Sequence, residues 1–409
     1  MLADIRDPAL WPEGAERIAW ARRFMPVLNA LGDGRLPGGA AQGGAEGGRV
    51  DLRGARVGLV LVLEPKTANL ALALRDAGAE VIVTCPGRET ADDVAAALVR
   101  EGVAVLARSD ATRSQDDDLA RRMLAEHLDV LVDDGARVVR LAHAEDRLAG
   151  LRGAAEETTS GLRPLRRMAE QGDLRIPVMA VNDARSKYLF DNVHGTGQSC
   201  VLAALDLTGL DLDGLTCVVA GYGYVGQGVA RYAAALGARV VVTEVEPFAA
   251  LRAHHEGYEV RTLRAACPEA DLVFSATGVA HTITAGHLAA MKDGAVVAVA
   301  GGVPDEVEVP PGGAEVRPGV TRHGHVLVLA GGECVNCAAA EGNPIEIMDL
   351  SLSVQFLAVE YLLTHDLPPA VHLMPAHLDE RVARLKLGAL GVELDLPSAE
   401  QRAFLGRGL

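Results

Sequence analysis

One stretch near the middle of the chain limits its possible folds more than any other. Residues 215–247 form, in order, an apolar run, a glycine-rich turn, a helical pattern and a second apolar run. Gly221, Gly223 and Gly226 have GxGxxG spacing. The first glycine permits a tight turn, the second lets a pyrophosphate approach the backbone, and the third lets the helix pack on the strand. The helix N-terminus adds free N–H groups for phosphates. The stretch therefore predicts a dinucleotide-binding unit.

The acidic residue at the end of the second strand indicates which dinucleotide binds. Glu244 lies 21 residues after Gly223. A carboxylate in this place accepts hydrogen bonds from ribose hydroxyls and repels a 2′-phosphate, which favours NAD over NADP. Further cofactor contacts are expected inside the turn and after a strand predicted at 271–278, from Tyr224, Val225, Thr277 and Gly278.

The N-terminal half shows the same alternation of strands and helices. It predicts a parallel sheet with helices on both faces, in which ligands bind at the carboxyl ends of the strands. Asp133, Asp134 and Gly135 end one strand, so either a functional site or a capped turn is expected there. The fold class is thus α/β with two Rossmann-like, doubly wound parallel sheets. Strands are predicted at 56–63, 80–85, 103–107, 128–134 and 294–302, and helices at 67–79, 92–102 and 119–127.

Three further segments complete the organisation. Residues 1–30 have apolar positions at helical spacing, and the Gly-rich segment 32–48 is expected to be a flexible loop. Residues 349–365 predict a long amphipathic helix, at which the chain crosses back to its first domain.

Composition excludes several classes of protein. With 39 Lys+Arg against 55 Asp+Glu, the net charge of −16 argues against a nucleic-acid binder. The sequence contains no run of about 18 apolar residues, so we predict no membrane span. The N-terminus does not resemble a signal peptide. The six scattered cysteines favour a reduced, cytoplasmic setting. Cys334 and Cys337 form a CxxC without a second ligand pair, so we predict no metal site.

A polar segment at 180–199 carries candidate chemistry. Lys187 and Asp191 are four residues apart and would share one face of a helix. They could form an exposed ion pair. Alternatively, they could hold and deprotonate a hydroxyl beside a nicotinamide ring, because a hydride leaves an alcohol as its proton leaves.

Seven ordered segments, this one included, are similar to the S-adenosylhomocysteine hydrolase family. The resemblance implies a nucleoside-binding domain formed by 1–190 and 348–409, with an NAD domain at 191–347 inserted between them. It also implies a cycle in which the 3′-hydroxyl is oxidised, the 4′ proton is lost and the 5′ substituent leaves. In the hydrolase, water then adds and the ketone is reduced. The matching segments are EETTSG (156–161), VNDARSKYLFDN (181–192), AGYGYVGQGVA (220–230), 243–260, SATG (275–278), LAGGECVN (329–336) and 371–396.

The resemblance implies roles for individual residues. Lys187 and Asp191 match the pair at the 3′-hydroxyl, and Glu157 matches the acid that binds the ribose hydroxyls. Asp134 matches an aspartate near C4′ and C5′, with Asn182 beside it. Matches to positions that touch NAD are Thr158, Thr159, Asn192, Glu244 and Asn336.

Departures from the family pattern fall in the substrate pocket. Val62 stands where the family has a histidine that serves acid–base chemistry at C5′ and the added water. Glu64 and Lys66 replace a threonine and a glutamate that help recognise adenine. The final residues, FLGRGL, lack the basic tail of the family. Assembly as a dimer or tetramer is therefore expected from the family resemblance alone. The other departures are Thr196 for a cysteine, Gly302 and Asn343 for histidines, and Arg137 for an aspartate.

These observations favour an NAD-dependent enzyme that oxidises and eliminates without adding water, a nucleoside 4′,5′-dehydratase or lyase. His194 and Lys66 are candidate proton donors, although a packing role is favoured for His194. Ordinary hydrolysis of S-adenosylhomocysteine and 3′-epimerisation remain alternatives. A non-catalytic NAD-binding regulator is the alternative from another class, and it would have no need of Lys187, Asp191, Glu157 and Asp134 together.

Overall fold

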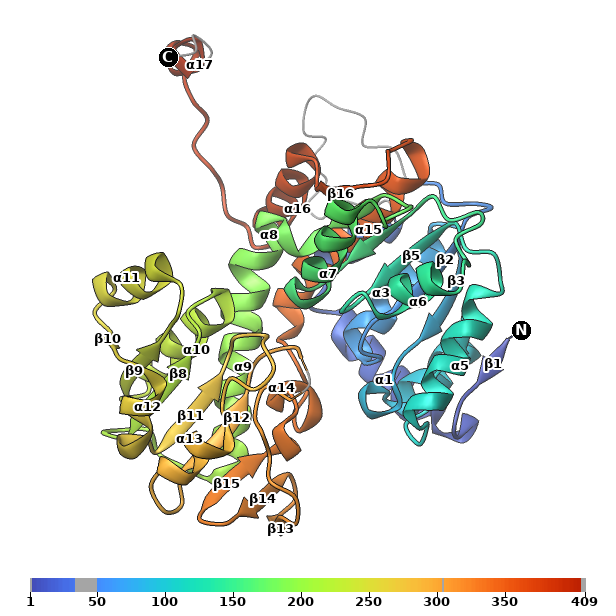
Figure 1. The fold of residues 1–409 in the computed structure, drawn as a ribbon. Coiled ribbons are helices and arrows are strands. Elements are labelled where there is room, and N and C mark those ends of the chain that lie inside the picture. Colours follow the sequence, from blue (N-terminus) through green and yellow to red (C-terminus); the bar gives the residue numbers. More distant parts are fainter. Residues whose placement is uncertain (1, 34–49, 304, 406–409) are drawn as a thin grey trace.

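The computed structural model describes residues 2–33, 50–303 and 305–405, and it contains two eight-stranded sheets (Figure 1). The first sheet has the order β1-β4-β3-β2-β5-β6-β7-β16, and every neighbouring pair is parallel. Its strands are β1 (Ala3–Asp4), β2 (Arg56–Val60), β3 (Glu80–Thr84), β4 (Ala104–Leu106), β5 (Val130–Asp133), β6 (Gly153–Glu156), β7 (Val178–Ala180) and β16 (Val371–Leu373). The predicted strands of the N-terminal half are confirmed, with shorter bounds.

The second sheet has the order β10-β9-β8-β11-β12-β15-β14-β13. It is parallel as far as β15, but β14 and β13 extend it in antiparallel fashion. The sequence predicted only parallel strands there, because the short β13–β14 hairpin carries no crossover helix to mark it. The strands are β8 (Thr216–Ala220), β9 (Arg239–Thr243), β10 (Glu259–Val260), β11 (Leu272–Ser275), β12 (Val296–Val299), β13 (Ala314–Arg317), β14 (Val320–His323) and β15 (Val326–Leu329).

The order of strands along the chain shows how the two sheets are connected. The chain leaves the first sheet after β7, builds the whole second sheet, and returns to the first with β16. The second sheet is therefore inserted between two strands of the first, and the predicted domain division at 190 and 347 stays a prediction. We call the two sheets with their covering helices the first and the second sheet unit.

Helices cover both sheets. Figure 1 shows α17 (Ala399–Leu405) standing away from both sheet units, whereas α15 and α16 lie on the first. Helices of the first unit are α1 (Trp11–Arg22), α2 (Pro26–Asp33), α3 (Pro65–Asp76), α4 (Asp92–Arg100), α5 (Arg113–Leu124), α6 (Arg137–Ala144), α7 (Thr159–Gln171), α15 (Ile345–Thr364) and α16 (Ala376–Ala389). Those of the second are α9 (Gly197–Thr208), α10 (Tyr224–Ala235), α11 (Pro247–His255), α12 (Leu263–Ala266), α13 (Ala285–Ala290) and α14 (Val335–Ala338).

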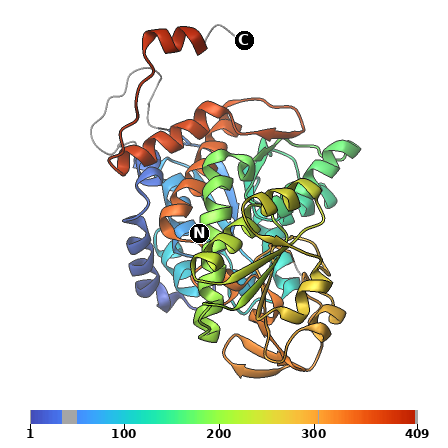
Figure 2. The same ribbon diagram turned by 90° about the vertical axis from the view of Figure 1, so that its left-hand side faces the viewer.

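The helix predicted at 349–365 is confirmed as α15, but its predicted amphipathic character is wrong. Helix α15 packs against α2, α3, α16 and β6, and Figure 2 shows it beside the blue N-terminal helices. Burial on all sides replaces the expected polar face. The helix is long and apolar enough to cross a bilayer, yet 72% of its most apolar window is buried in the molecule, as in a core helix. The helical lead-in before residue 30 is confirmed by α1 and α2, whereas the predicted loop at 32–48 lies almost wholly outside the described residues.

Candidate functional site

The strands β5 and β6 end in four acidic residues, which divide into two pairs by their hydrogen bonds. Asp133 accepts from the backbone N–H groups of Val138 and Val139, both at 2.8 Å, and so caps the start of α6. Glu156 accepts from the N–H groups of Gly135 and Ala136. Burial raises the pKa of Asp133 to about 7 and also raises that of Glu156. Asp133 and Glu156 therefore hold the turn rather than face a ligand.

The second pair, Asp134 and Glu157, faces the polar segment that links the two units. Thr158 donates to Asp134 Oδ1 at 2.8 Å, so one expected cofactor-contact residue lies against an expected catalytic one. Glu157 Oε1 lies 3.6 Å from Lys187 Nζ and has no hydrogen-bond partner among the described residues. The ends of β5 and β6 thus bring two carboxylates to the lysine.

Lys187 lies at the centre of a buried polar cluster. Its Nζ is 2.9 Å from Asp191 Oδ2 and 2.8 Å from Asn192 Oδ1, and the side chains of Lys187 and Asp191 are only 5% and 3% exposed. The interpretation as an exposed ion pair is therefore wrong. Lys187 ends the short helix α8 (Arg185–Lys187), and residues Tyr188–Thr196 form a π-helix (η5). In this wider helix Asp191 and Asn192 both reach one ammonium group. Asn192 in turn donates to Asn182 at 3.3 Å.

Helix α15 supplies two partners that the sequence reasoning missed. Ser351 Oγ donates to Asp191 Oδ2 at 2.8 Å, and Gln355 Nε2 donates to Glu157 Oε2 at 2.6 Å. Both residues are fully buried in a helix whose buried positions are mostly apolar. Their signal was available, since polar residues within a core helix require polar partners.

The charges of the cluster follow from burial and attraction. Burial alone would lower the pKa of Lys187, but attraction to Asp191 and Glu157 outweighs it and raises the pKa, so the side chain remains an ammonium. Burial raises the pKa of Glu157 to about 7, against the opposing attraction of Lys187. Burial likewise raises the pKa of Asp134. The cluster thus combines one fixed cation with Glu157, whose pKa is raised to about 7, and Asp134, whose pKa is also raised.

The second sheet unit reaches the cluster through Asn343. Its amide nitrogen donates to Asp191 Oδ1 and, at 3.1 Å, to Thr196 Oγ1. Its amide oxygen accepts from Asn336 Nδ2 at 2.8 Å. The structure therefore brings Thr196, Asn336 and Asn343 together with Asp191, although the sequence grouped them as separate pocket and cofactor residues.

The GxGxxG turn has the shape that a dinucleotide requires. Gly221 has φ +94°, a conformation that favours glycine. A Cβ at Gly226 would lie 2.0 Å from Gly221 O, whereas a Cβ at Gly223 would meet nothing within 4 Å. The turn is thus closely packed inside and open at Gly223. Gly223 also starts α10 without a side-chain cap, which leaves the first N–H groups of that helix for phosphate.

The other expected cofactor residues surround this turn. Glu244 directly follows β9 and accepts from Tyr222 N–H at 2.6 Å, which places its carboxylate beside the turn. Tyr224 stacks on Tyr188 with ring centroids 4.6 Å apart, Val225 follows it in α10, and Thr159 begins α7. Thr277 and Gly278 follow β11, where both carbonyl groups accept from Arg163. These residues fit NAD.

The residues expected beside the nucleobase, Glu64 and Lys66, are held by contacts within the protein. Glu64 caps α3 and lies 3.0 Å from Lys66 Nζ, which also donates to Glu341 O at 2.8 Å. Lys66, only 5% exposed, is therefore bound rather than poised as a proton donor. Val62 follows β2, and its carbonyl accepts from Thr67 Oγ1 at 2.6 Å.

Within the described part of the chain, three further residues form no hydrogen bond or ion pair with the cluster. His194 Nδ1 lies 3.0 Å from Tyr232 Oη, and burial lowers its pKa, which favours the packing role. Arg137 pairs with Asp117 at 3.0 Å. A Cβ at Gly302 would meet only Ser160, at 3.5 Å.

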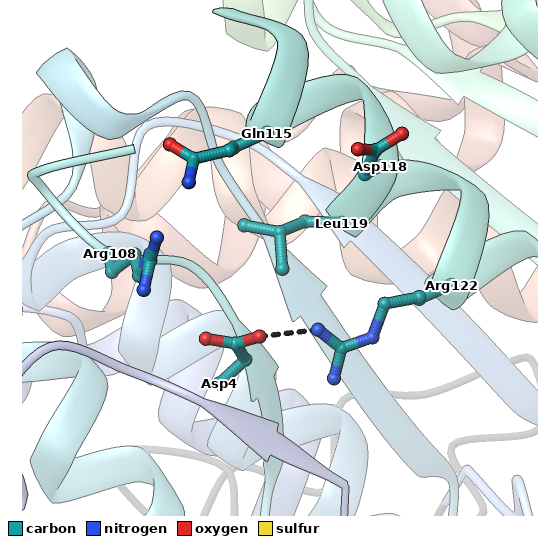
Figure 3. A pocket seen from close by; sticks show the side chains of 6 residues that line it. All are labelled: Asp4, Arg108, Gln115, Asp118, Leu119 and Arg122. Atoms are coloured by element: carbon teal, nitrogen blue, oxygen red, sulfur yellow. Dashed lines mark hydrogen bonds and ion pairs between the residues drawn. The ribbon is translucent and has the colours of Figure 1, made fainter. Parts of the chain in front are cut away.

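A surface pocket elsewhere carries none of these residues. Figure 3 shows it, with an ion pair between Asp4 and Arg122. It lies at the outer edge of the first sheet, by β1 and α5, so it is separate from the cluster at the ends of β5 and β6. Its lining residues are Asp4, Arg108, Gln115, Asp118, Leu119 and Arg122.

Comparison with known proteins agrees with this geometry. Residues 192–342 match the family model described as S-adenosyl-L-homocysteine hydrolase, NAD binding domain. An S-inosyl-L-homocysteine hydrolase from Methanopyrus kandleri is 41% identical, over 98% of this chain and 96% of the relative. An adenosylhomocysteinase from Thermotoga maritima is 40% identical, over 96% of this chain and 98% of the relative. The chain is therefore an NAD-binding enzyme that belongs to the S-adenosyl-L-homocysteine hydrolase family.

Proposed function

We propose that this enzyme oxidises the 3′-hydroxyl of a nucleoside, removes the 4′ proton and eliminates the 5′ substituent, without adding water. The observation that carries the proposal is the buried cluster of Lys187, Asp191 and Glu157 at the junction of the two sheet units. Among the described residues, no histidine forms a hydrogen bond or ion pair with this cluster. The groups for oxidation are thus present, whereas Val62 offers no acid–base group at the end of β2.

The charges of the cluster indicate which side chain donates a hydrogen bond to the 3′-oxygen and which accepts the hydroxyl proton. Lys187 remains an ammonium, so it holds the 3′-oxygen by donation and stabilises negative charge there, while the Asp191 carboxylate accepts the hydroxyl proton. Glu157 Oε1 has no hydrogen-bond partner among the described residues and accepts from a ribose hydroxyl. NAD, which the glycine turn and the Glu244 carboxylate would hold, would supply the acceptor for the C3′ hydride and its source for the later reduction.

The elimination itself requires a base near C4′. The 3′-ketone makes the C4′ proton acidic, and Lys187 stabilises the resulting enolate oxygen. Burial raises the pKa of Asp134 above its ordinary value, which makes this carboxylate a stronger base for that proton. The C4′–H bond and the bond from C5′ to its substituent break, a 4′,5′ double bond forms, and the substituent leaves with a proton.

Hydrolysis is the second candidate, because the relatives at 41% and 40% identity are named as hydrolases of S-inosyl- and S-adenosylhomocysteine. In that reaction water adds to the double bond before the ketone is reduced. The two outcomes differ only in the fate of C5′. An experiment that follows oxygen at this carbon therefore separates them.

The test is mass spectrometry of purified enzyme with NAD in H₂¹⁸O, using S-adenosylhomocysteine, S-inosylhomocysteine and 5′-hydroxy nucleosides. A 4′,5′-unsaturated nucleoside without ¹⁸O supports elimination. Adenosine or inosine that carries ¹⁸O establishes hydrolysis and overturns the proposal. The Val62→His variant is the matched comparison, since a histidine at the end of β2 should shift product toward the ¹⁸O-labelled nucleoside. Lys187→Ala should lose all turnover, and unchanged activity would contradict the catalytic assignment.

A further inference from the structure

Asn343 uses both halves of its amide group in the cluster. The nitrogen donates to Asp191 Oδ1 and to Thr196 Oγ1, and the oxygen accepts from Asn336 Nδ2 at 2.8 Å and Ser199 Oγ at 3.2 Å. These partners fix which end of the amide faces the carboxylate, because a carboxylate accepts only from the nitrogen end. Asn343 therefore has no free polar atom to offer a substrate.

The approach of Asn343 to Asp191 is built into the backbone. A Cβ at Gly195 would lie 2.8 Å from both Asn343 Nδ2 and Asp191 Oδ1. Any side chain there would force the two groups apart. Glycine at this place in the π-helix is thus needed for their contact, independently of the identity of residue 343.

The remaining contacts of Asp191 show what this contact achieves. Oδ2 faces Lys187 Nζ at 2.9 Å and Ser351 Oγ at 2.8 Å, while Oδ1 faces Asn343. Donors on both oxygens hold the carboxylate in one orientation. Ser351 belongs to α15 and Asn343 to the loop that precedes it, so the carboxylate is held by the segment that returns from the second unit to the first.

We propose that Asn343 is a positioning residue, which holds Asp191 against Lys187 for the oxidation of the 3′-hydroxyl, rather than a substrate contact. This inference rests on the proposed function, since it assumes that Asp191 accepts the hydroxyl proton. It differs from the expectation that residue 343 lines the substrate pocket. Asn336, which joins Asn343 to the NAD-binding unit, places the same network beside the cofactor-binding residues.

The experiment measures reduction of enzyme-bound NAD in a single turnover after mixing with a nucleoside. Asn343→Ala should slow this step by roughly 10- to 100-fold, with less than about threefold change in nucleoside dissociation constant, because orientation and not binding is lost. Gly195→Ala should produce the same slowing. Asn29→Ala is the control, because it removes the hydrogen bond from an asparagine amide in α2 to Arg22 O at the end of α1. It should change neither the rate of NAD reduction nor the dissociation constant.

A second variant, Asn343→Asp, changes the pH midpoint of NAD reduction only if Asn343 acts on Asp191. The new carboxylate repels Asp191, whose other charged neighbours are Lys187, Glu157 and Asp134. The pH midpoint of the reduction step should therefore move upward, while Asn343→Ala moves it less. An unchanged midpoint would count against the proposal.

The outcomes separate this inference from the proposed function. If the wild type reduces NAD and Asn343→Ala does so equally fast, the positioning role is wrong while the oxidation stands. If none of the nucleosides causes reduction of NAD in the wild type, the proposed function is wrong, and a crystal structure of Asn343→Ala then decides the inference. Asp191 keeping its orientation in that structure would overturn it, and a rotated carboxylate would support it.

Discussion

At the residue scale, the proposed role of Glu157 and its hydrogen bond with Gln355 predict how ribose binding depends on pH. In the proposed function Glu157 accepts from a ribose hydroxyl in its ionised form, and burial raises its pKa to about 7. We therefore expect kcat/KM to rise with pH through about 7. Gln355 donates to this carboxylate and so favours its charged form. Gln355→Leu should raise the pKa further and lower kcat/KM at pH 7 by roughly tenfold.

The measurement is the pH profile of kcat/KM for the wild type and the variant. Ser353→Ala is the matched control, because Ser353 Oγ lies buried in the same helix without a hydrogen-bond partner among the described residues. Its profile should superimpose on that of the wild type. A Gln355→Leu profile that moves to lower pH would contradict the argument, since loss of a donor cannot favour the carboxylate.

Sequence reasoning at this scale succeeded only where partners were close along the chain. Lys187 and Asp191 are four residues apart, and their contact was predicted from helical spacing. Ser351, Gln355 and Asn343 lie about 150 residues or more from their carboxylate partners. Burial of a polar residue in a core helix indicates that it has a partner, but no local pattern indicates which one, because the partner depends on how α15 packs on the first unit.

At the scale of elements, the start of α3 depends on a buried ion pair. The side chains of Glu64 and Lys66 are 17% and 6% exposed, and burial raises the pKa of Glu64 despite the attraction of Lys66. Removal of the ammonium leaves a buried carboxylate without compensation. We expect Lys66→Met to reduce the free energy of unfolding by about 3 kcal/mol, and Glu64→Gln with Lys66→Met to recover most of it.

The check is urea unfolding of both single variants and the double variant, read as a double-mutant cycle. A loss in the double variant equal to the sum of the two single losses would show that the pair does not couple. Glu64→Gln alone keeps an acceptor for the helix start, so it separates the capping contribution from the ion pair.

The elements themselves were predicted with uneven success for a physical reason. Runs such as 56–63 are apolar because parallel strands are buried on both faces, and these strands were found. In α15, burial on every side leaves no polar face, and the prediction of amphipathicity failed. The π-helix at Tyr188–Thr196 was also missed, since a wider turn is favoured by the contacts of Asp191 and Asn192 rather than by residue propensity.

At the scale of the whole molecule, the family resemblance predicted the inserted arrangement, and the structure has the second sheet between β7 and β16. The contacts that join the two units were not predictable. Arg88, next to β3, pairs with Glu333 before α14, and Arg163 of α7 donates to Gly278 O at 2.9 Å. Such contacts depend on the relative placement of the two units, which no local pattern encodes.

These two contacts predict a salt-sensitive opening of the molecule. The side chains of Arg88 and Glu333 are 56% and 43% exposed, so their pair contributes only about 0–1 kcal/mol and is screened by salt. We expect the double variant Arg88→Ala, Arg163→Ala to have a larger radius of gyration by small-angle X-ray scattering than the wild type in low salt. Because both contacts hold the units together without forming either core, thermal unfolding should change little.

High salt should enlarge the wild type toward the variant, since it weakens the same ion pair. Adding NAD and a nucleoside should return the variant to the wild-type radius if the ligands bind to both units, because ligand contacts then replace the lost ones. Arg53→Ala, which removes an exposed ion pair with Asp51 inside the first unit, is the control for loss of surface charge. Equal radii for wild type and variant under all conditions would show that other contacts, such as Lys66 with Glu341 O, hold the units together.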